Sequence, residues 1–466
     1  MHNQANVFFI KAESRQTTLN SGNMDSDSQR RSIQGGSRSR LARGGASWAM
    51  LVIMVLCVGT TTASPPPCTN DGTTTYKCAN AGYTTFPLSM FDPNTYMIRL
   101  EHNAITLIPN DVFDGLTKLN YLFLHFNAIT SIPSGVFDGV TQLIWLFLNF
   151  NAITSIPSGV FDGLTKLVWL RFHDNAITSI ASSAFDDLTA LIDLYLSSNA
   201  IASFPSALFD NLTTLVQLSL FNNMITSFST GIFDALTALV QLSLDRNPIA
   251  SIPSGLFDNL TALEELNLHT IALTSIPAGI FDTLTALVKL QLSSNAITSI
   301  LSGLFDNLTT LVELSLNHNA ITSIPSGLFD NLTTLVTLRL NNNAITSILS
   351  GLFGNLTTLA KLSLNSNAIT SIAGGVLDGL TALGFLHLGD NLITSIPGGV
   401  LDGRTALGFL YLYDNSITSI PSGLFNDLTA LLELYLYSNA ITSIPAGIFD
   451  TLTAVVKLYL STNAIT

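Results

Sequence analysis

Aromatic side chains recur at one fixed interval in two parts of the chain. The first group is Tyr121, Phe123, Phe126, Trp145, Phe147, Phe150 and Trp169. The second group is Phe385, Phe409, Tyr411, Tyr413, Tyr435 and Tyr437. Soluble proteins seldom leave contiguous aromatics bare, and Trp and Tyr are favoured anchors in binding interfaces. The pattern predicts noncovalent ligand binding at both groups. The alternative is that aromatic residues merely suit strands or cover the ends of a sheet.

Residue patterns typical of catalysis are missing from this sequence. It contains no P-loop, no G-x-G-x-x-G, no G-x-S-x-G and no H-E-x-x-H. The carboxylates fall in repeated positions and do not converge on one cleft. We therefore expect no enzymatic activity, no catalytic residues and no cofactor.

Metal binding is not expected either. Six of the seven histidines fall at exposed strand positions, without a carboxylate at ligand spacing in the neighbouring period. A row of aspartates that begins with Asp114, Asp138 and Asp162 could attract calcium. Because each lacks a cluster of carboxylates in its own loop, turn capping is the preferred interpretation.

The elements that position these residues follow one period. From Asn103 to Asn463 every 24th residue is Asn, with Ile271 as the single exception. Each period contains L-x-x-L-x-L, as in Leu239 to Leu244, whose last two leucines point to one face of a short strand. One unit cannot bury its leucines alone, but stacked units form a continuous core. The Asn is expected to point inward and satisfy backbone groups where the chain leaves the strand.

This repeat resembles the extracellular, 24-residue class of leucine-rich repeat, as found in variable lymphocyte receptor, Toll and Slit-type ectodomains. The resemblance covers residues 95–466, sixteen units with the last one incomplete. It implies an α/β solenoid, a curved horseshoe with a parallel β-sheet on the concave face and irregular or short helical turns on the convex face. Residues 64–94 resemble an N-terminal cap of this family, although such caps often contain four cysteines and this segment has two.

Composition and charge restrict the class of protein. The 466 residues are 47% hydrophobic and 11% charged, so most of the chain is expected to be ordered. The net charge of −13 argues against a nucleic-acid partner, because such binding depends on neutralising phosphates.

Residues 1–63 read as a targeting segment. Residues 1–47 are predicted to be a disordered basic leader, and residues 48–63 a signal-peptide core and cleavage region, cut before Ser64. The alternative is an uncleaved signal anchor. Removing residues 1–63 leaves 11 basic and 28 acidic residues, a net charge of −17. The protein is therefore predicted to be secreted, or alternatively anchored at the cell surface.

Two kinds of modification follow from an extracellular location. Cys68 and Cys78 remain after cleavage and are expected to form a disulfide, with two free thiols as the alternative. Five Asn-Leu-Thr sequons are candidate glycan acceptors, although the same residues also suit the packing of the repeat. The sequon asparagines are Asn211, Asn259, Asn307, Asn331 and Asn355.

At three places the sequence departs from the regular repeat in a way that leads to a prediction. Ile271 lacks the amide of the Asn row, so we expect a distortion or a bound water near Asn267 to Thr274. Arg404 replaces a core Leu, so its charge must reach solvent or pair. The sequence stops at Thr466 within a repeat, which favours a fragment that lacks a cap, a membrane anchor or a signalling domain. The alternative is an open end that packs on a partner, including a second copy.

Two functions fit this sequence. The first is receptor-type or immune-type recognition of an extracellular protein or glycan through the concave face. The second is a structural matrix or adhesion role, favoured by the near-identity of units five to twelve. A membrane is expected to be contacted only through the signal anchor or a missing carboxyl-terminal anchor.

Overall fold

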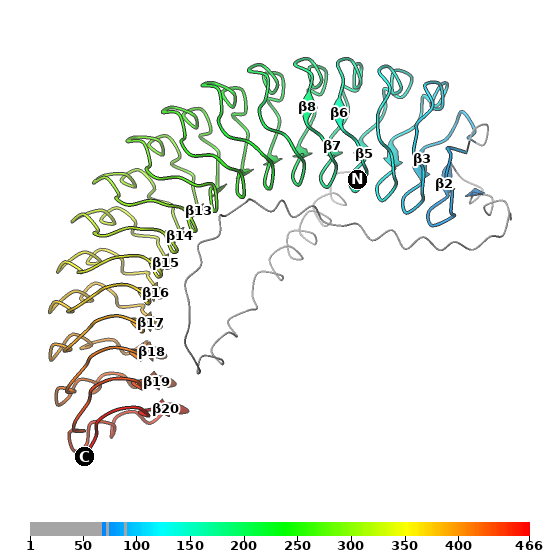
Figure 1. Ribbon diagram of the computed structural model, residues 1–466. Coiled ribbons are helices and arrows are strands. Elements are labelled where there is room, and N and C mark those ends of the chain that lie inside the picture. Colours follow the sequence, from blue (N-terminus) through cyan, green and yellow to red (C-terminus); the bar gives the residue numbers. More distant parts are fainter. Residues whose placement is uncertain (1–67, 71–73, 88–90) are drawn as a thin grey trace, which may run out of the picture. The chain divides into compact units, whose positions relative to one another are not determined.

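Every 24-residue period contributes one three-residue strand to a single sheet in the computed structural model (Figure 1). The strands are short because the chain turns out of the sheet directly after the last leucine of each unit. The sixteen repeat strands are β3 (Met97–Arg99), β4 (Tyr121–Phe123), β5 (Trp145–Phe147), β7 (Trp169–Arg171), β9 (Asp193–Tyr195), β10 (Gln217–Ser219), β11 (Gln241–Ser243), β12 (Glu265–Asn267), β13 (Lys289–Gln291), β14 (Glu313–Ser315), β15 (Thr337–Arg339), β16 (Lys361–Ser363), β17 (Phe385–His387), β18 (Phe409–Tyr411), β19 (Glu433–Tyr435) and β20 (Lys457–Tyr459).

The structure describes residues 68–70, 74–87 and 91–466, which belong to one compact unit. The predicted leader, the predicted signal core and cleavage site, and Cys57 lie outside these residues. Our expectations for the segment 1–63 therefore stay predictions.

Consecutive repeat strands pair in parallel and in strict register, so that Tyr121 faces Trp145 and Phe123 faces Phe147. The strands line the inner side of the arc in Figure 1, and the outer side consists of turns. Among the described residues there is no helix. A second sheet of two short strands, β6 (Ser155–Ile156) and β8 (Ser179–Ile180), lies between strand and outer turn of two adjacent repeats. The arrangement confirms the predicted solenoid with a parallel concave sheet and irregular outer turns.

The core runs without interruption along the solenoid. The inward leucines of the strands, such as Leu146 and Leu314, are fully buried. On the outer side one buried Phe per turn stacks on the next, as for Phe137 and Phe161, whose ring centroids lie 6.1 Å apart. Leu377 and Leu401 replace the Phe in two adjacent turns, and a small apolar cavity of about 10 Å³ lies beside them. The smaller side chain accounts for the space.

The row of asparagines ties each turn to the one before it. The Asn319 Nδ2 donates to Leu316 O at 3.0 Å in its own turn and to Leu292 O at 3.0 Å in the preceding turn. Its Oδ1 accepts from Ile297 N, also in the preceding turn, at 3.1 Å. The amide therefore satisfies backbone groups that neither strand nor turn can pair. This confirms the role that the sequence predicts for the Asn row.

The break in this row at Ile271 produces the distortion that we expected. With no amide at position 271, the Ile249 N–H donates instead to Asn247 O of its own turn, at 2.9 Å. Ala272 adopts a positive φ of 68°, a conformation that other repeats do not need at this position. Asn295 then accepts from both Ile271 N and Leu273 N, each at 3.1 Å. The backbone thus rearranges over a few residues and the solenoid continues.

Arg404 differs from our expectation. Arg404 is 7% exposed, and no carboxylate of the described residues forms an ion pair with it. Instead its Nη1 donates to Leu377 O at 2.7 Å and its Nε donates to Asp402 O at 3.1 Å. Backbone carbonyls of two turns hold the guanidinium, an arrangement that the sequence alone does not reveal.

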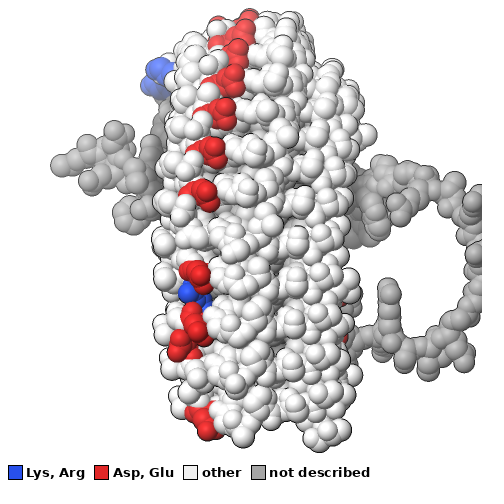
Figure 2. Space-filling view, turned by 90° about the vertical axis from the view of Figure 1, so that its left-hand side faces the viewer, with Lys and Arg blue, Asp and Glu red and all other residues white. Residues whose placement is uncertain are grey.

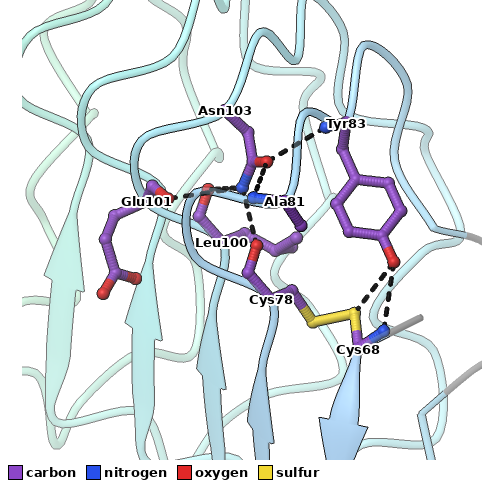
Figure 3. Close-up of a disulfide and its surroundings, with 7 residues drawn as sticks. All are labelled: Cys68, Cys78, Ala81, Tyr83, Leu100, Glu101 and Asn103. Atoms are coloured by element: carbon purple, nitrogen blue, oxygen red, sulfur yellow. Dashed lines mark hydrogen bonds between the residues drawn. A yellow bond between two sulfur atoms is a disulfide. The ribbon is translucent and has the colours of Figure 1, made fainter. Parts of the chain in front are cut away.

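The amino-terminal end of the sheet is closed by a disulfide-linked hairpin (Figure 3). Strands β1 (Thr69–Asn70) and β2 (Thr75–Lys77) are antiparallel, β2 pairs in parallel with β3, and Cys68 is bonded to Cys78. The Asn103 Oδ1 accepts from Ala81 N and Tyr83 N at 3.0 Å each. The first asparagine of the row therefore fixes the hairpin to the first repeat.

The asparagine row predicts opposite effects for two exchanges. Asn319→Ile removes the acceptor of the Ile297 N–H and is expected to destabilise the solenoid by about 2 kcal/mol, because a buried donor loses its partner. Ile271→Asn restores an acceptor for the Ile249 N–H and is expected to raise stability. Urea unfolding followed by circular dichroism measures both. A lower midpoint for Ile271→Asn, or an unchanged one for Asn319→Ile, would contradict this role of the row.

Candidate functional site

Four positions of each turn project from the inner face of the sheet and line up in columns along the solenoid. In the turn of β5 they are Trp145, Phe147, Asn149 and Phe150, which we call the first, second, third and fourth columns. The columns are straight because every turn has the same length and the strands pair in register. Neighbouring members of a column therefore lie about 4.8 Å apart, close enough for aromatic rings to stack.

The first predicted group forms one continuous surface, which we call the N-terminal aromatic cluster. Its members are Tyr121, Phe123, Phe126, Trp145, Phe147, Phe150 and Trp169. In the first column the Trp145 and Trp169 rings stack with centroids 4.6 Å apart and planes 7° apart. In the fourth column Phe126 and Phe150 stack at 4.2 Å and are 40% and 38% exposed. The structure therefore brings all seven together, while their role in binding stays a prediction.

Three further residues extend this cluster and were not predicted from the sequence. The Arg171 guanidinium carbon lies 4.5 Å from the Phe147 ring centroid and 5.3 Å from that of Tyr195. The Tyr96 ring meets Tyr121 edge to face at 5.1 Å. Arg171 and Tyr195 occupy the second column directly after Phe123 and Phe147, so continuing that column past its last Phe would have found them.

Two histidines of the third column are less exposed than we expected. His125 and His173 are half-buried beside the aromatic rings. Burial lowers the pKa of His125 below its usual value. Burial, together with the charge of Arg171, lowers the pKa of His173 to about 4. Both imidazoles are therefore neutral at physiological pH.

The second predicted group is also assembled, and we call it the C-terminal aromatic cluster. Its members are Phe385, Phe409, Tyr411, Tyr413, Tyr435 and Tyr437. Tyr413 and Tyr437 stack at 4.8 Å, and Tyr411 and Tyr435 at 4.5 Å. The Tyr411 hydroxyl donates to Glu433 Oε2 at 2.9 Å. Burial and this carboxylate raise the pKa of Tyr411, so the hydroxyl keeps its proton.

Between the clusters the same columns are mostly polar, and several of their members pair with one another. His269 Nε2 lies 3.1 Å from Asp245 Oδ2, and Glu313 pairs with Arg339. The Gln291 Nε2 donates to Glu313 Oε1 at 3.1 Å. The aromatic clusters are therefore distinct patches on an otherwise polar inner face.

The outer side carries a row of acidic residues, visible in Figure 2 as a line along the turns. Their carboxylates fold back over their own turns. Asp258 Oδ2, for example, lies 3.2 Å from the position that a Cβ on Gly255 would take. Among the described residues no group of three or more His, Cys, Asp or Glu side chains is placed to hold a metal ion.

The five sequon asparagines are exposed and lie in these outer turns, next to the acidic row. Three of them also contribute to packing between turns. Asn307, Asn331 and Asn355 donate through Nδ2 to the carbonyl of an aspartate in the preceding turn. Their modification stays a prediction, and any glycan would leave the inner face free.

The described part of the chain contains no helix that is long and apolar enough to cross a membrane.

Comparison with protein families gives matches along most of the chain. The family described as leucine rich repeat matches residues 93–152, 121–175, 141–201, 170–225, 193–249, 214–270, 357–417 and 407–465. A second family, the BspA type leucine rich repeat region, matches residues 250–383. No curated protein sequence gives a significant match.

Several solved structures are similar to this one. Toll of Drosophila, solved in complex with Spatzle, is 27% identical with a TM-score of 0.69, covering 79% of this chain and 49% of its own. A leucine-rich-repeat protein of Leptospira interrogans is 27% identical with a TM-score of 0.70, covering 83% of this chain and 95% of its own. An internalin of Listeria monocytogenes is 27% identical with a TM-score of 0.52, covering 71% and 84%. The chain thus spans about half the length of the Toll chain that it matches.

The lowered pKa of His173 predicts a local loss of stability in acid. Its pKa of about 4 in the folded state lies below the ordinary value of 6.5, so between these values the unfolded state binds the proton and the folded state does not. Stability is therefore retained above pH 6.5 and falls as the pH drops toward 4. At pH 4.5 we expect His173 to contribute a loss of about 2 kcal/mol relative to pH 7, and His173→Gln removes this contribution.

Tryptophan fluorescence during urea unfolding at pH 7 and pH 4.5 measures this loss, since Trp145 and Trp169 lie in the same part of the solenoid. His318→Gln is the matched control, because His318 occupies an exposed position far from the cluster. An equal pH dependence for wild type and His173→Gln would contradict the expectation.

Proposed function

The chain belongs to the leucine-rich repeat family, and from this premise we propose that it is an extracellular recognition module that binds a macromolecule through its concave face. We infer that it is secreted, or else held at the cell surface, and that its ligand is a protein or a glycan. The N-terminal aromatic cluster is the binding site of this proposal, with Trp145, Trp169, Phe147 and Phe123 as its anchors.

One observation carries the proposal. Seven aromatic side chains form a continuous patch on the inner face, while the same columns between the two aromatic clusters are mostly polar. Stacking alone does not require this placement, because the polar columns between the clusters support the same strand register without aromatic rings. A patch that folding does not need is best explained by an interface.

The similar chains support a protein ligand. Toll is bound to Spatzle in its structure, and its identity of 27% with this chain extends over 79% of the residues. Ligand identity does not follow from fold, so the partner has to come from the surface itself.

A structural role in matrix or adhesion is the second candidate. The polar columns are closely alike over consecutive turns, with Gln217 and Ser219 followed by Gln241 and Ser243 in the next turn. A protein whose repeats mainly act as spacers, or stack on one another, needs no more variation among the residues of these columns.

Capture of a partner distinguishes the two functions. We expect the full chain to retain a specific protein from extracellular material, and the Trp145→Ala/Trp169→Ala variant to lose it. Removing two large aromatic anchors from an interface typically costs several kcal/mol of binding energy. The matched control is Gln217→Ala/Gln241→Ala, at the same column of two polar turns between the clusters. Each variant is first checked for an unchanged melting temperature.

Loss of the partner in the tryptophan variant alone supports a recognition site in the N-terminal aromatic cluster. Equal capture by all three proteins, or capture by none, would contradict it and favour the structural role.

A further inference from the structure

Four consecutive turns beside the N-terminal aromatic cluster each leave one buried polar atom without a partner. These atoms are Glu101 Oε2, His125 Nδ1, Asn149 Oδ1 and His173 Nδ1. Within the described residues none of them has a hydrogen bond. All four residues belong to the third column, following β3, β4, β5 and β7, so they form a row with about 4.8 Å between neighbours. We call them the acceptor row.

The acceptor row is costly for the folded protein. Glu101 is 3% exposed and Asn149 is 6% exposed. A buried polar atom without a partner destabilises the folded state, and native proteins rarely place several together. In the same column Ser197 is buried with a small side chain, so the fold does not require Glu, His or Asn at these positions. Four such atoms in adjacent turns indicate a ligand that would supply their missing hydrogen bonds.

The carboxylate of Glu101 is held in place through one oxygen, while its other, buried oxygen has no hydrogen bond among the described residues. The Arg99 Nε donates to Glu101 Oε1 at 2.8 Å, which leaves Oε2 unpaired. Figure 3 shows the carboxylate pointing away from Asn103 and from the disulfide, which lie on the other side of the strand. Phe126 and Phe150 are exposed rings that pack against His125 and His173, so the row lies beside the exposed part of the cluster.

The chemistry of the row selects a hydrogen-bond donor. A carboxylate oxygen and an amide oxygen can only accept, and the Nδ1 of a neutral imidazole can accept as well. An anion such as a phosphate or sulfate has no donors to offer and would meet the Glu101 charge. The ligand must therefore present N–H or O–H groups.

Two features favour a guanidinium over a sugar. A sugar stacks on an open aromatic face, but Trp145 and Trp169 each cover one face of the other. Tyr121 lies against Trp145, and Arg171 lies over Trp169. Phe126 and Phe150 likewise stack on each other, with His102 and His173 against their other sides. A guanidinium already fits among these rings, because Arg171 lies over Phe147 and Trp169. The net charge of −17 on residues 64–466 also attracts a basic partner over distance.

We propose that the acceptor row binds an arginine-bearing segment of a partner protein, whose guanidinium donates to Glu101 Oε2 and whose neighbouring N–H or O–H groups donate to Asn149 Oδ1 beside the rings of the aromatic cluster. This inference rests on the proposed function, since it names the partner chemistry of the same concave site.

A random peptide library selected on the purified full chain tests the proposal. We expect the selected peptides to be enriched in arginine. Replacing the arginine of a selected peptide with citrulline, a neutral group of similar shape, should weaken binding to the wild type about tenfold. The same exchange should have little effect on binding to Glu101→Gln, because this variant lacks the carboxylate that receives the guanidinium, and Asn149→Leu should weaken the binding of both peptides alike.

Asn317→Leu is the matched control. Asn317 Oδ1 is also buried without a partner among the described residues and lies in the same column, but it is far from the aromatic cluster. This variant should bind the arginine peptide as the wild type does. Fluorescence of Trp145 and Trp169 establishes that each variant keeps the cluster folded, and Glu101→Gln serves as the second variant if Asn149→Leu does not fold.

The outcomes separate this inference from the proposed function. Peptides that depend on Trp145 and Trp169 but show no preference for arginine would overturn the acceptor row and leave the recognition site standing. Binding of an oligosaccharide on a glycan array, dependent on the same tryptophans and without peptide binding, would do the same. An arginine preference that Glu101→Gln retains would also overturn it.

Discussion

The hydrogen bonds of one buried asparagine per turn determine how the rest of this solenoid is arranged. Each amide pairs with the backbone of two consecutive turns, as Asn319 does with Leu292 and Leu316. A turn of any other length would move this amide away from its partners, so the period stays constant from Asn103 to Asn463. Ile271 shows the extent of the constraint, because the backbone around it takes a positive φ at Ala272 to compensate. Constant length is what keeps the strands in register.

The register of the strands determines which side chains become neighbours on the concave face. Side chains of one column lie about 4.8 Å apart, which is near the stacking distance of aromatic rings. Aromatic residues placed at consecutive positions therefore stack on each other, and Trp145 and Trp169 present edges rather than faces to a partner. The same geometry brings Glu101, His125, Asn149 and His173 into one row. Substitutions at intervals of 24 residues therefore produce a patch on this face, without any change in the core behind it.

Much of this could be predicted from the sequence because the repeat is regular. The strand positions, the inward asparagines, the distortion at Ile271 and the disulfide between Cys68 and Cys78 each follow from a residue type at a fixed place. The missed features depend on which neighbours a side chain meets. Arg404 finds carbonyls of the preceding turn and stays buried, and His173 is half-buried with a pKa of about 4. Side-chain rotamers and contacts with neighbouring rings determine how deeply such a residue is buried, and the repeat period alone does not specify them.

The central claim is that a partner contacts the N-terminal aromatic cluster and not the outer turns. Photo-crosslinking tests it most directly. The photoreactive amino acid benzoylphenylalanine is placed at Tyr121 on the inner face or at Asp330 in an exposed outer turn, and each full chain is irradiated in extracellular material. The account predicts a discrete protein adduct at Tyr121 and none at Asp330. An adduct at Asp330 alone, or the same adducts at both positions, would contradict it.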